Sequence, residues 1–328
     1  MPVYVNTNYS ALQGQRYLGN VQNSLTTTYQ RLSSGLRINS AKDDAAGLQI
    51  ADRLTSQING LNQGNRNASD GIALAQTIES GMDEISGMLQ KIRTLTVQAA
   101  NGTNTKEDRA ALSKEATALA TEINRIATQT TFAGKTVLNG MGSSSIFGKD
   151  AAAGNGQNGG PGKAGKTGTM TLQVGSNKGD TISFDIDSVM FSKIAVEGGA
   201  GGKLIGADKI FKTDNNTGAV TVTFTKADFA NAGADAYIGK VIELMDTAIS
   251  KVDGMRAGLG ALQNRLESSI RNQSNVAANE ADARSRIRDA DFAEESANLS
   301  QQSIIQQAAA SMLMQANTRP QLGLSLLG

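Results

Sequence analysis

Residues 75–99 read AQTIESGMDEISGMLQKIRTLTVQA, and their apolar side chains recur at alternating steps of three and four residues. This spacing places the side chains along one side of an α-helix, where they form a seam that a second helix can cover. The members of the seam are Ala75, Ile78, Met82, Ile85, Leu89, Ile92, Thr96 and Ala99. The stretch therefore predicts a long helix that depends on a partner helix for its stability.

The same periodicity continues toward both ends of the chain. On the N-terminal side, a seam contains Leu18, Val21, Leu25, Thr28 and Leu32. On the C-terminal side, a seam contains Met245, Ala248, Val252, Met255, Leu259, Leu262 and Leu266, and a narrower stripe near the end contains Ile305, Ala308, Met312 and Ala316. Proline is absent between positions 2 and 161 and between positions 161 and 320, so long uninterrupted helices are permitted.

Local signals mark where these helices begin and end. The Ser33-Ser34-Gly35 triplet is expected to end the first helix, and Ser40-Ala41-Lys42-Asp43 has the form of a capping box that opens the second. Asn101-Gly102-Thr103-Asn104 closes the second helix, which is then about 90 Å long at 1.5 Å per residue. The seam keeps its phase through Gly71, which favours one continuous helix over a turn at that glycine. A third helix carries Leu112, Ala116, Leu119, Ile123 and Ile126.

The middle of the chain has a different character. Residues 140–168 are rich in Gly, Ser, Ala and Lys, which predicts a loop. Two strand-like runs, Met170–Val174 and Thr181–Ile186, predict a hairpin, and a second pair is expected at Lys209–Thr213 and Ala219–Phe224. The predicted fold class is therefore mainly α, with long antiparallel helices in a coiled coil formed by the N- and C-terminal segments and a β-rich central insert.

The terminal helices predict self-association. Their apolar stripes are narrow and contain many Ala, Thr and Gln residues, so an isolated pair of these helices is marginally stable. Packing between copies supplies the missing burial, and head-to-tail contacts of that kind extend into an open helical filament. The predicted filament-assembly contacts are Leu18, Val21, Leu25, Leu32, Leu36, Ile305, Ala308, Met312 and Ala316.

The composition excludes several classes of function. The chain has 31 basic and 30 acidic residues and a formal charge of +1, which argues against nucleic-acid binding. It contains no cysteine and no histidine, which excludes nearly all nitrogen- or sulfur-ligated metal sites and histidine-based catalysis. We therefore predict a structural protein with no catalytic residues, no metal and no cofactor. No apolar run reaches the length of a membrane span. The first eight residues lack the pattern of a signal peptide, so if the protein leaves the cell, we expect export without a cleaved signal peptide.

Five stretches carry a resemblance to a known family. Residues 31–48 read RLSSGLRINSAKDDAAGL, residues 66–72 RNASDGI, and residues 97–103 VQAANGT. Residues 286–293 read RIRDADFA, and the chain closes with LSLLG at residues 324–328. In this order, at both ends of the chain, these stretches closely resemble bacterial flagellin. The resemblance covers about residues 1–140 and 237–328.

The resemblance implies a subunit that polymerises into the helical filament of the extracellular bacterial flagellum for motility. It implies an inner terminal coiled-coil domain from residues 1–43 with 288–328. Residues 44–140 and 169–190 with 238–287 are implied to form a helical rod domain with a β-hairpin. Residues 141–168 are then an exposed Gly-rich loop, and residues 191–237 a small variable outer domain.

The implied partners are other copies of the chain, the flagellar export apparatus with its chaperone, and the filament cap and hook-associated proteins. The resemblance also implies recognition of the monomer by the host innate immune receptor for flagellin. The implied receptor contacts are Gln90, Lys91, Arg93, Leu95 and Glu115. Of these, Lys91, Arg93 and Leu95 lie off the predicted seam, so we expect their side chains to be free to face a partner.

Two other structural readings fit parts of the sequence. The related hook–filament junction protein shares helical ends, although its termini match these stretches less fully. A generic coiled-coil adhesin or scaffold would explain the seams but not the five stretches. O-linked glycans on exposed Ser and Thr residues of the middle are a further expectation.

Overall fold

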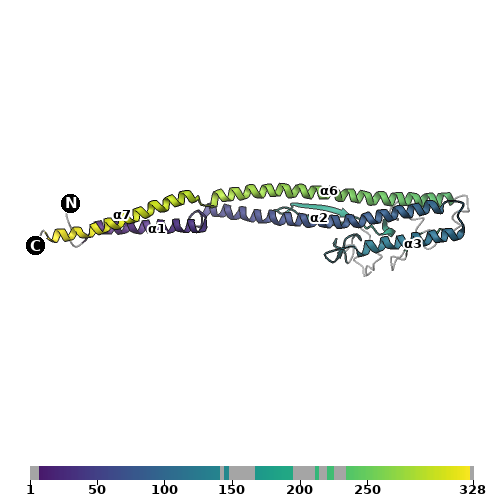
Figure 1. Ribbon diagram of the computed structural model, residues 1–328, viewed down its shortest axis with the longest axis horizontal. Coiled ribbons are helices and arrows are strands. Elements are labelled where there is room, and N and C mark those ends of the chain that lie inside the picture. The colour runs from purple at the N-terminus through teal and green to yellow at the C-terminus, as the bar shows by residue number, and fades with distance from the viewer. Residues whose placement is uncertain are drawn as a thin grey trace. The chain divides into compact units, whose positions relative to one another are not determined.

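The computed structural model describes residues 7–140, 144–147, 167–194, 211–213, 220–224 and 234–325, most of which are helical (Figure 1). Most of the loop predicted at 141–168 lies outside these residues. Contacts divide the chain into a terminal unit, residues 1–60 with 275–328, and a central unit, residues 61–274. This division cuts α2 (Ala45–Ala99) and α6 (Ala234–Arg288), whereas the predicted borders at 43/44 and 287/288 fall close to the ends of these helices. The predicted domains stay a prediction.

Helix α2 is one uninterrupted helix of 55 residues, which confirms the predicted passage through Gly71. The predicted capping box at its start is wrong. The Ser40 backbone N–H and hydroxyl both donate to Asp43 Oδ2, at 2.9 and 3.1 Å, and these bonds hold the pKa of Asp43 below its usual value. The Gly47 N–H donates to Asp44 Oδ1 at 2.9 Å, so Asp44 caps the helix and Asp43 closes the loop before it.

The core of the central unit follows the predicted seams. On α2, the side chains of Ile78, Met82, Ile85, Leu89 and Ile92 are fully buried. On α6, Met245, Val252, Leu259 and Leu266 are buried in the same cluster, together with Ala116 and Ile123 of α3 (Lys106–Gln129). Helix α3 begins at a capping box in which Thr105 and Asp108 bond reciprocally.

Two surface ion pairs show that α2 and α6 run antiparallel. Asp83 pairs with Arg256 at 3.0 Å, and ten residues further along α2, Arg93 pairs with Asp246, ten residues back on α6. On its other side α2 contacts α3, where Lys91 pairs with Glu115 at 3.0 Å. The part of α2 in the central unit therefore has helices on two sides (Figure 1).

Among the described residues, the strands pair as three antiparallel hairpins. The predicted hairpins are confirmed as β3 (Gly168–Gln173) with β4 (Thr181–Ile186) and β5 (Phe211–Thr213) with β6 (Val220–Val222). A third, β1 (Thr131–Phe132) with β2 (Lys135–Thr136), was not predicted. Its turn residues Ala133 and Gly134 both have positive φ, at 49° and 79°, as a two-residue hairpin turn requires.

Within residues 191–237, which are predicted to form an outer domain, two of the described segments pack against the core of the central unit. Phe191 and Ile194 of α4 (Phe191–Ile194) are buried, and the Phe191 N–H donates to Asn124 Oδ1 of α3 at 3.0 Å. Strand β6 also lies on α3, because the Val222 N–H donates to Thr117 Oγ1 at 2.9 Å. Polar side chains of α3 thus accept hydrogen bonds from backbone N–H groups of this segment. The spacing of apolar residues gives no sign of these contacts.

Glycines in α2 allow the β3–β4 hairpin to lie directly on the helix. A Cβ at Gly64 would lie 2.0 Å from the carbonyl oxygen of Val174, and one at Gly71 would lie 2.4 Å from Leu172 Cδ1. Each glycine costs up to about 1 kcal/mol in helix propensity relative to alanine. The close contacts of the hairpin explain why these positions nevertheless lack side chains.

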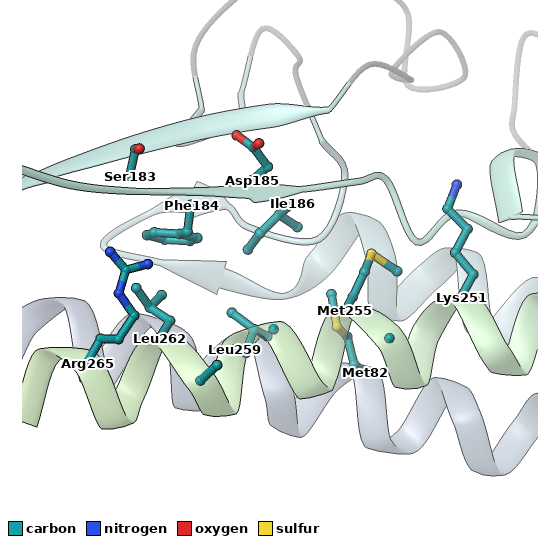
Figure 2. Close-up of a pocket in the computed structure, with 13 residues that line it drawn as sticks. Met82, Ser183, Phe184, Asp185, Ile186, Lys251, Met255, Leu259, Leu262 and Arg265 are labelled. Carbon is teal, nitrogen blue, oxygen red and sulfur yellow. The ribbon is translucent and has the colours of Figure 1, made fainter.

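A groove enclosing about 470 Å³ lies between β4 and α6. Figure 2 shows Phe184 and Ile186 pointing from β4 toward α6, with Leu259 and Leu262 beneath them. Gly254 and Gly258 of α6 also line the groove, and a Cβ at either would meet nothing within 4 Å. The groove is therefore hollow where α6 carries no side chains.

Candidate assembly surface

The terminal unit contains the helices for which self-association is predicted. Helix α1 (Tyr9–Ser34) begins at Asn8, whose Oδ1 accepts from the Ala11 N–H at 3.1 Å. It ends, as predicted, at Gly35, which has a φ of 71° and donates to the Arg31 carbonyl. Helix α7 (Phe292–Ser325) begins after Asp291, whose Oδ1 accepts from the Ala293 N–H at 2.8 Å. The two helices lie side by side (Figure 1).

Backbone hydrogen bonds join the loop after α1 to the loop before α7. The Arg37 N–H donates to the Arg288 carbonyl at 2.7 Å, and the Ala290 N–H donates to the Gly35 carbonyl at 3.0 Å. Leu36 and Asp289 form an antiparallel bridge. Helix α1 therefore ends, and helix α7 begins, at one hydrogen-bonded junction, and Leu36 is half-buried beside it.

The predicted seam of α1 is confirmed as the face that packs against α7 of the same chain. Leu18, Val21, Leu25 and Leu32 are half-buried, and Thr28 is 4% exposed. Gly14 continues this face, since a Cβ there would lie 3.9 Å from the Cβ of Leu313. These residues form a contact within the chain, and their role in assembly between copies stays a prediction.

The stripe predicted on α7 is not the face that meets α1. We define the pairing stripe as the buried and half-buried residues of α7 that recur at steps of four and three: Glu295, Leu299, Gln302, Gln306, Ala309, Leu313 and Ala316. Of the four predicted residues only Ala316 belongs to it. Ile305, Ala308 and Met312, the outer stripe, each precede a member of the pairing stripe and so lie about 100° around the helix.

Polar contacts connect the pairing stripe to α1. Arg31 Nη1 donates to Glu295 Oε1 at 2.9 Å, and Thr28 Oγ1 donates to Gln302 Oε1 at 3.4 Å. The Glu295 side chain is only 8% exposed. Within the described part of the chain, neither Glu295 Oε2 nor Arg31 Nε has a hydrogen-bond partner, although both atoms are buried.

A third polar contact lies near the free ends of the pair. Pro320 has no N–H, so it cannot donate to the carbonyl of Ala316 four residues earlier in α7. Asn8 Nδ2 donates to this carbonyl at 2.8 Å. The side chain that caps α1 thereby also satisfies the acceptor that the proline leaves open in α7.

The outer surface of the α1–α7 pair carries several large exposed apolar side chains and few charges. Ile305 is 42% exposed and Met312 70% exposed. The other large exposed apolar side chains of the two helices are Tyr9, Leu12, Tyr17, Tyr29, Phe292, Ile304 and Met314. In sequence, the two helices contain five charged residues: Arg16 and Arg31 on α1, and Glu294, Glu295 and Arg319 on α7. Large exposed apolar side chains on two packed helices make this surface a candidate for interaction.

The residues predicted to contact the receptor lie in the central unit. Gln90, Lys91 and Glu115 are exposed, and the Lys91–Glu115 ion pair joins α2 to α3. Arg93 is partly exposed, and its hydrogen bond to Asp246 raises the pKa of its guanidinium above the usual value for arginine. These polar side chains form one surface across three helices.

The expectation that Leu95 is free to face a partner is wrong, because its side chain is only 6% exposed. Leu74, Gly81, Met88 and Leu95 recur every seven residues and form a second, largely buried stripe on α2. The predicted seam assumed that α2 packs against one partner helix. Since α2 has helices on two sides, a second stripe is buried as well.

Comparisons with known proteins agree at both ends of the chain. A family model for the bacterial flagellin N-terminal helical region matches residues 5–143, and one for the C-terminal helical region matches residues 242–327. The chain is 37% identical to polar flagellin F of Vibrio parahaemolyticus and 38% identical to flagellin C of Vibrio cholerae, with all of each chain covered.

A solved structure shares the fold. It is that of a Vibrio parahaemolyticus protein proposed to be flagellar hook-associated, and it has a TM-score of 0.54 and 16% identity over 75% of this chain and all of that chain. In the described part of the chain, no helix combines the length and apolarity of a membrane span. Because these sequence relatives are flagellins and both flagellin helical regions match, the chain belongs to the bacterial flagellin family and is a structural subunit of the extracellular flagellar filament.

Proposed function

We propose that the chain polymerises through the outer surface of its α1–α7 pair, with the outer stripe of α7 packing against a neighbouring copy. The observation that carries this proposal is the exposure of Ile305 and Met312 on a helix whose pairing stripe is already occupied by α1. Burying one such side chain stabilises a contact by about 1.5–3 kcal/mol. Copies that repeat the contact head to tail extend into a filament.

The small number of charges on the pair supports the same proposal. Net repulsion between copies is weak when α1 carries only Arg16 and Arg31 and α7 only Glu294, Glu295 and Arg319. Apolar contacts that bury little charge also avoid the desolvation cost of unpaired ions. The surface therefore has the composition expected between copies in a polymer.

Trimming the chain to residues 45–287 tests where assembly resides, because it removes α1 and α7 but keeps the core of the central unit. We expect the intact chain to form filaments visible by electron microscopy and to raise light scattering, and the trimmed chain to stay monomeric. Circular dichroism checks that the trimmed chain keeps its helices. Polymerisation of the trimmed chain would place the assembly contacts outside α1 and α7.

We infer that the monomer is also recognised by the host innate immune receptor for flagellin, through a polar surface that includes Gln90, Lys91, Arg93 and Glu115. Support comes from their joint exposure around the Lys91–Glu115 ion pair. Leu95 contributes by packing in the core and not by contact. We expect Lys91→Glu to reduce reporter-cell activation by about tenfold, as 1.4 kcal/mol of lost binding does. A full response with unchanged folding would remove Lys91 from the contact.

We further infer export through the flagellar export apparatus with its chaperone, followed by incorporation beneath the filament cap beyond the hook-associated proteins. Export by this route is expected to leave the N-terminal residues on the chain. N-terminal sequencing of protein from sheared filaments checks this inference. The marginal α1–α7 pair fits export in an unfolded state.

A further inference from the structure

Asn101 and Gly102 lie in the turn that connects α2 to α3. Both residues are exposed, and neither belongs to a helix. Backbone hydrogen bonds hold the turn, since the Asn101 N–H donates to the Gln98 carbonyl at 3.1 Å and the Asn104 N–H donates to the Asn101 carbonyl at 3.2 Å. This turn belongs to neither of the surfaces proposed above for assembly and for the receptor.

An asparagine that precedes a glycine can cyclise onto its own backbone. The Gly102 nitrogen, after it loses its proton, attacks Asn101 Cγ, and the bond from Cγ to Nδ2 breaks. Ammonia leaves, and a five-membered succinimide ring remains. Water then opens the ring at one of its two carbonyl groups, which gives aspartate or isoaspartate. Glycine favours this reaction because it has no Cβ to hinder the approach and its backbone rotates freely.

The geometry of the turn assists the attack. The Thr103 N–H donates to Asn101 Oδ1 at 3.4 Å, a long hydrogen bond of the kind that folds an asparagine side chain over the peptide that follows it. Negative charge develops on Oδ1 when the Gly102 nitrogen adds to Cγ, and an N–H that already points at this oxygen stabilises the charge. Among the residues that the structure describes, none accepts a hydrogen bond from the Gly102 N–H, so the attacking nitrogen is not held elsewhere.

Two further Asn–Gly pairs of the described chain are protected by their surroundings. Asn59–Gly60 lies inside α2, where each backbone N–H donates to a carbonyl of the helix and the backbone angles are fixed. At Asn139–Gly140 the asparagine is half-buried with a buried Oδ1, and the glycine is buried with a φ of 64°. Of these three pairs, Asn101–Gly102 alone combines exposure with an unrestrained backbone. The pairs at Asn155 and Asn158 lie outside the described residues.

We propose that Asn101 is a self-modification site, at which the folded chain converts asparagine into aspartate and isoaspartate through a succinimide. The reaction consumes one water molecule and releases one ammonia molecule. The product carries one more negative charge, so the formal charge of the chain falls from +1 to zero. Helix α3 has its own capping box at Thr105 and Asp108, so the change stays local to the turn and the modified chain keeps its helices.

Incubation of the full-length chain at mildly alkaline pH, followed by peptide mass spectrometry, measures each pair separately in one sample. In the folded chain we expect Asn101 to deamidate at least about tenfold faster than Asn59 and Asn139, which corresponds to about 1.4 kcal/mol of activation free energy. In guanidinium chloride the three are expected to react at similar rates, because the fold no longer distinguishes them. Folding is thus expected to slow the reaction at Asn59 and Asn139 and not at Asn101.

Gly102→Ala is the matched variant, because a Cβ at Gly102 would meet nothing within 4 Å and its φ lies outside the left-handed region. The added methyl group hinders the attacking nitrogen, so we expect deamidation of Asn101 to slow by at least about tenfold. The rates at Asn59 and Asn139 and the Tm are expected to stay unchanged. Protection of Asn101 by folding as strong as that of the other two, or equal rates at Asn101 in the parent and the variant, would overturn the proposal.

Discussion

Replacing both Ile305 and Met312 by glutamate is expected to abolish filament formation at concentrations at which the parent chain polymerises. Each substitution removes the burial of one large apolar side chain, worth about 1.5–3 kcal/mol, at every contact along the filament. Each also places a carboxylate where the neighbouring copy offers few partners for it. The combined effect is expected to raise the required protein concentration by more than about a hundredfold.

Light scattering after seeding with parent filaments measures this effect, and electron microscopy shows whether any polymer forms. The matched control is I305L/M312L, which keeps side-chain volume and apolarity and is expected to polymerise like the parent. Both variants are expected to keep the Tm of the central unit, because the two side chains are exposed in the monomer. Normal filaments from the glutamate variant would exclude the outer stripe as an assembly surface.

Gly64→Ala is expected to lower the stability of the central unit, although alanine is the better helix former. Its Cβ would lie 2.0 Å from the carbonyl oxygen of Val174 and 2.7 Å from the carbonyl carbon. Both atoms are backbone, so no side-chain rotation relieves the clash and the β3–β4 hairpin must move off α2. Overpacking of this kind costs about 1–3 kcal/mol, which lowers the Tm by roughly 2–4 °C for each kcal/mol.

Gly87→Ala is the matched control in the same helix. A Cβ there would meet nothing within 4 Å, and the position is exposed. Removing this glycine is expected to stabilise the helix by up to about 1 kcal/mol. Thermal unfolding followed by circular dichroism should therefore move in opposite directions for the two variants. A rise in Tm for Gly64→Ala would show that the hairpin does not rest on α2 at that point.

Much of the fold was predictable because helix seams are local patterns. The steps of three and four residues from Ala75 to Ala99, and from Met245 to Leu266, predicted the buried faces of α2 and α6. The helix-ending role of Gly35 was predictable because few other residues adopt a positive φ at that position. The residue that caps α2 was not predictable. Asp43 and Asp44 are adjacent carboxylates, and only the path of the chain decides which one accepts from the Gly47 N–H.

The structure gives different environments to the predicted assembly residues of α1 and to those of α7. On α1 a single stripe is apolar, and Leu18, Val21, Leu25 and Leu32 do face a partner helix. On α7 two adjacent stripes compete, and apolar periodicity selected Ile305 and Met312 over the pairing stripe. Those residues stay predicted assembly contacts, and their exposure in the monomer supports that role.

The sequence by itself determined the helices, their antiparallel pairing and the family, because heptad spacing, turn residues and long matching stretches are properties of neighbouring residues. Only the tertiary structure decided which neighbours each helix has. It buried Leu95 because α2 has helices on two sides, and it placed Val174 against Gly64. It also turned Glu295 toward Arg31 and the outer stripe away from α1. These outcomes depend on contacts between residues far apart in the chain, which no local pattern contains.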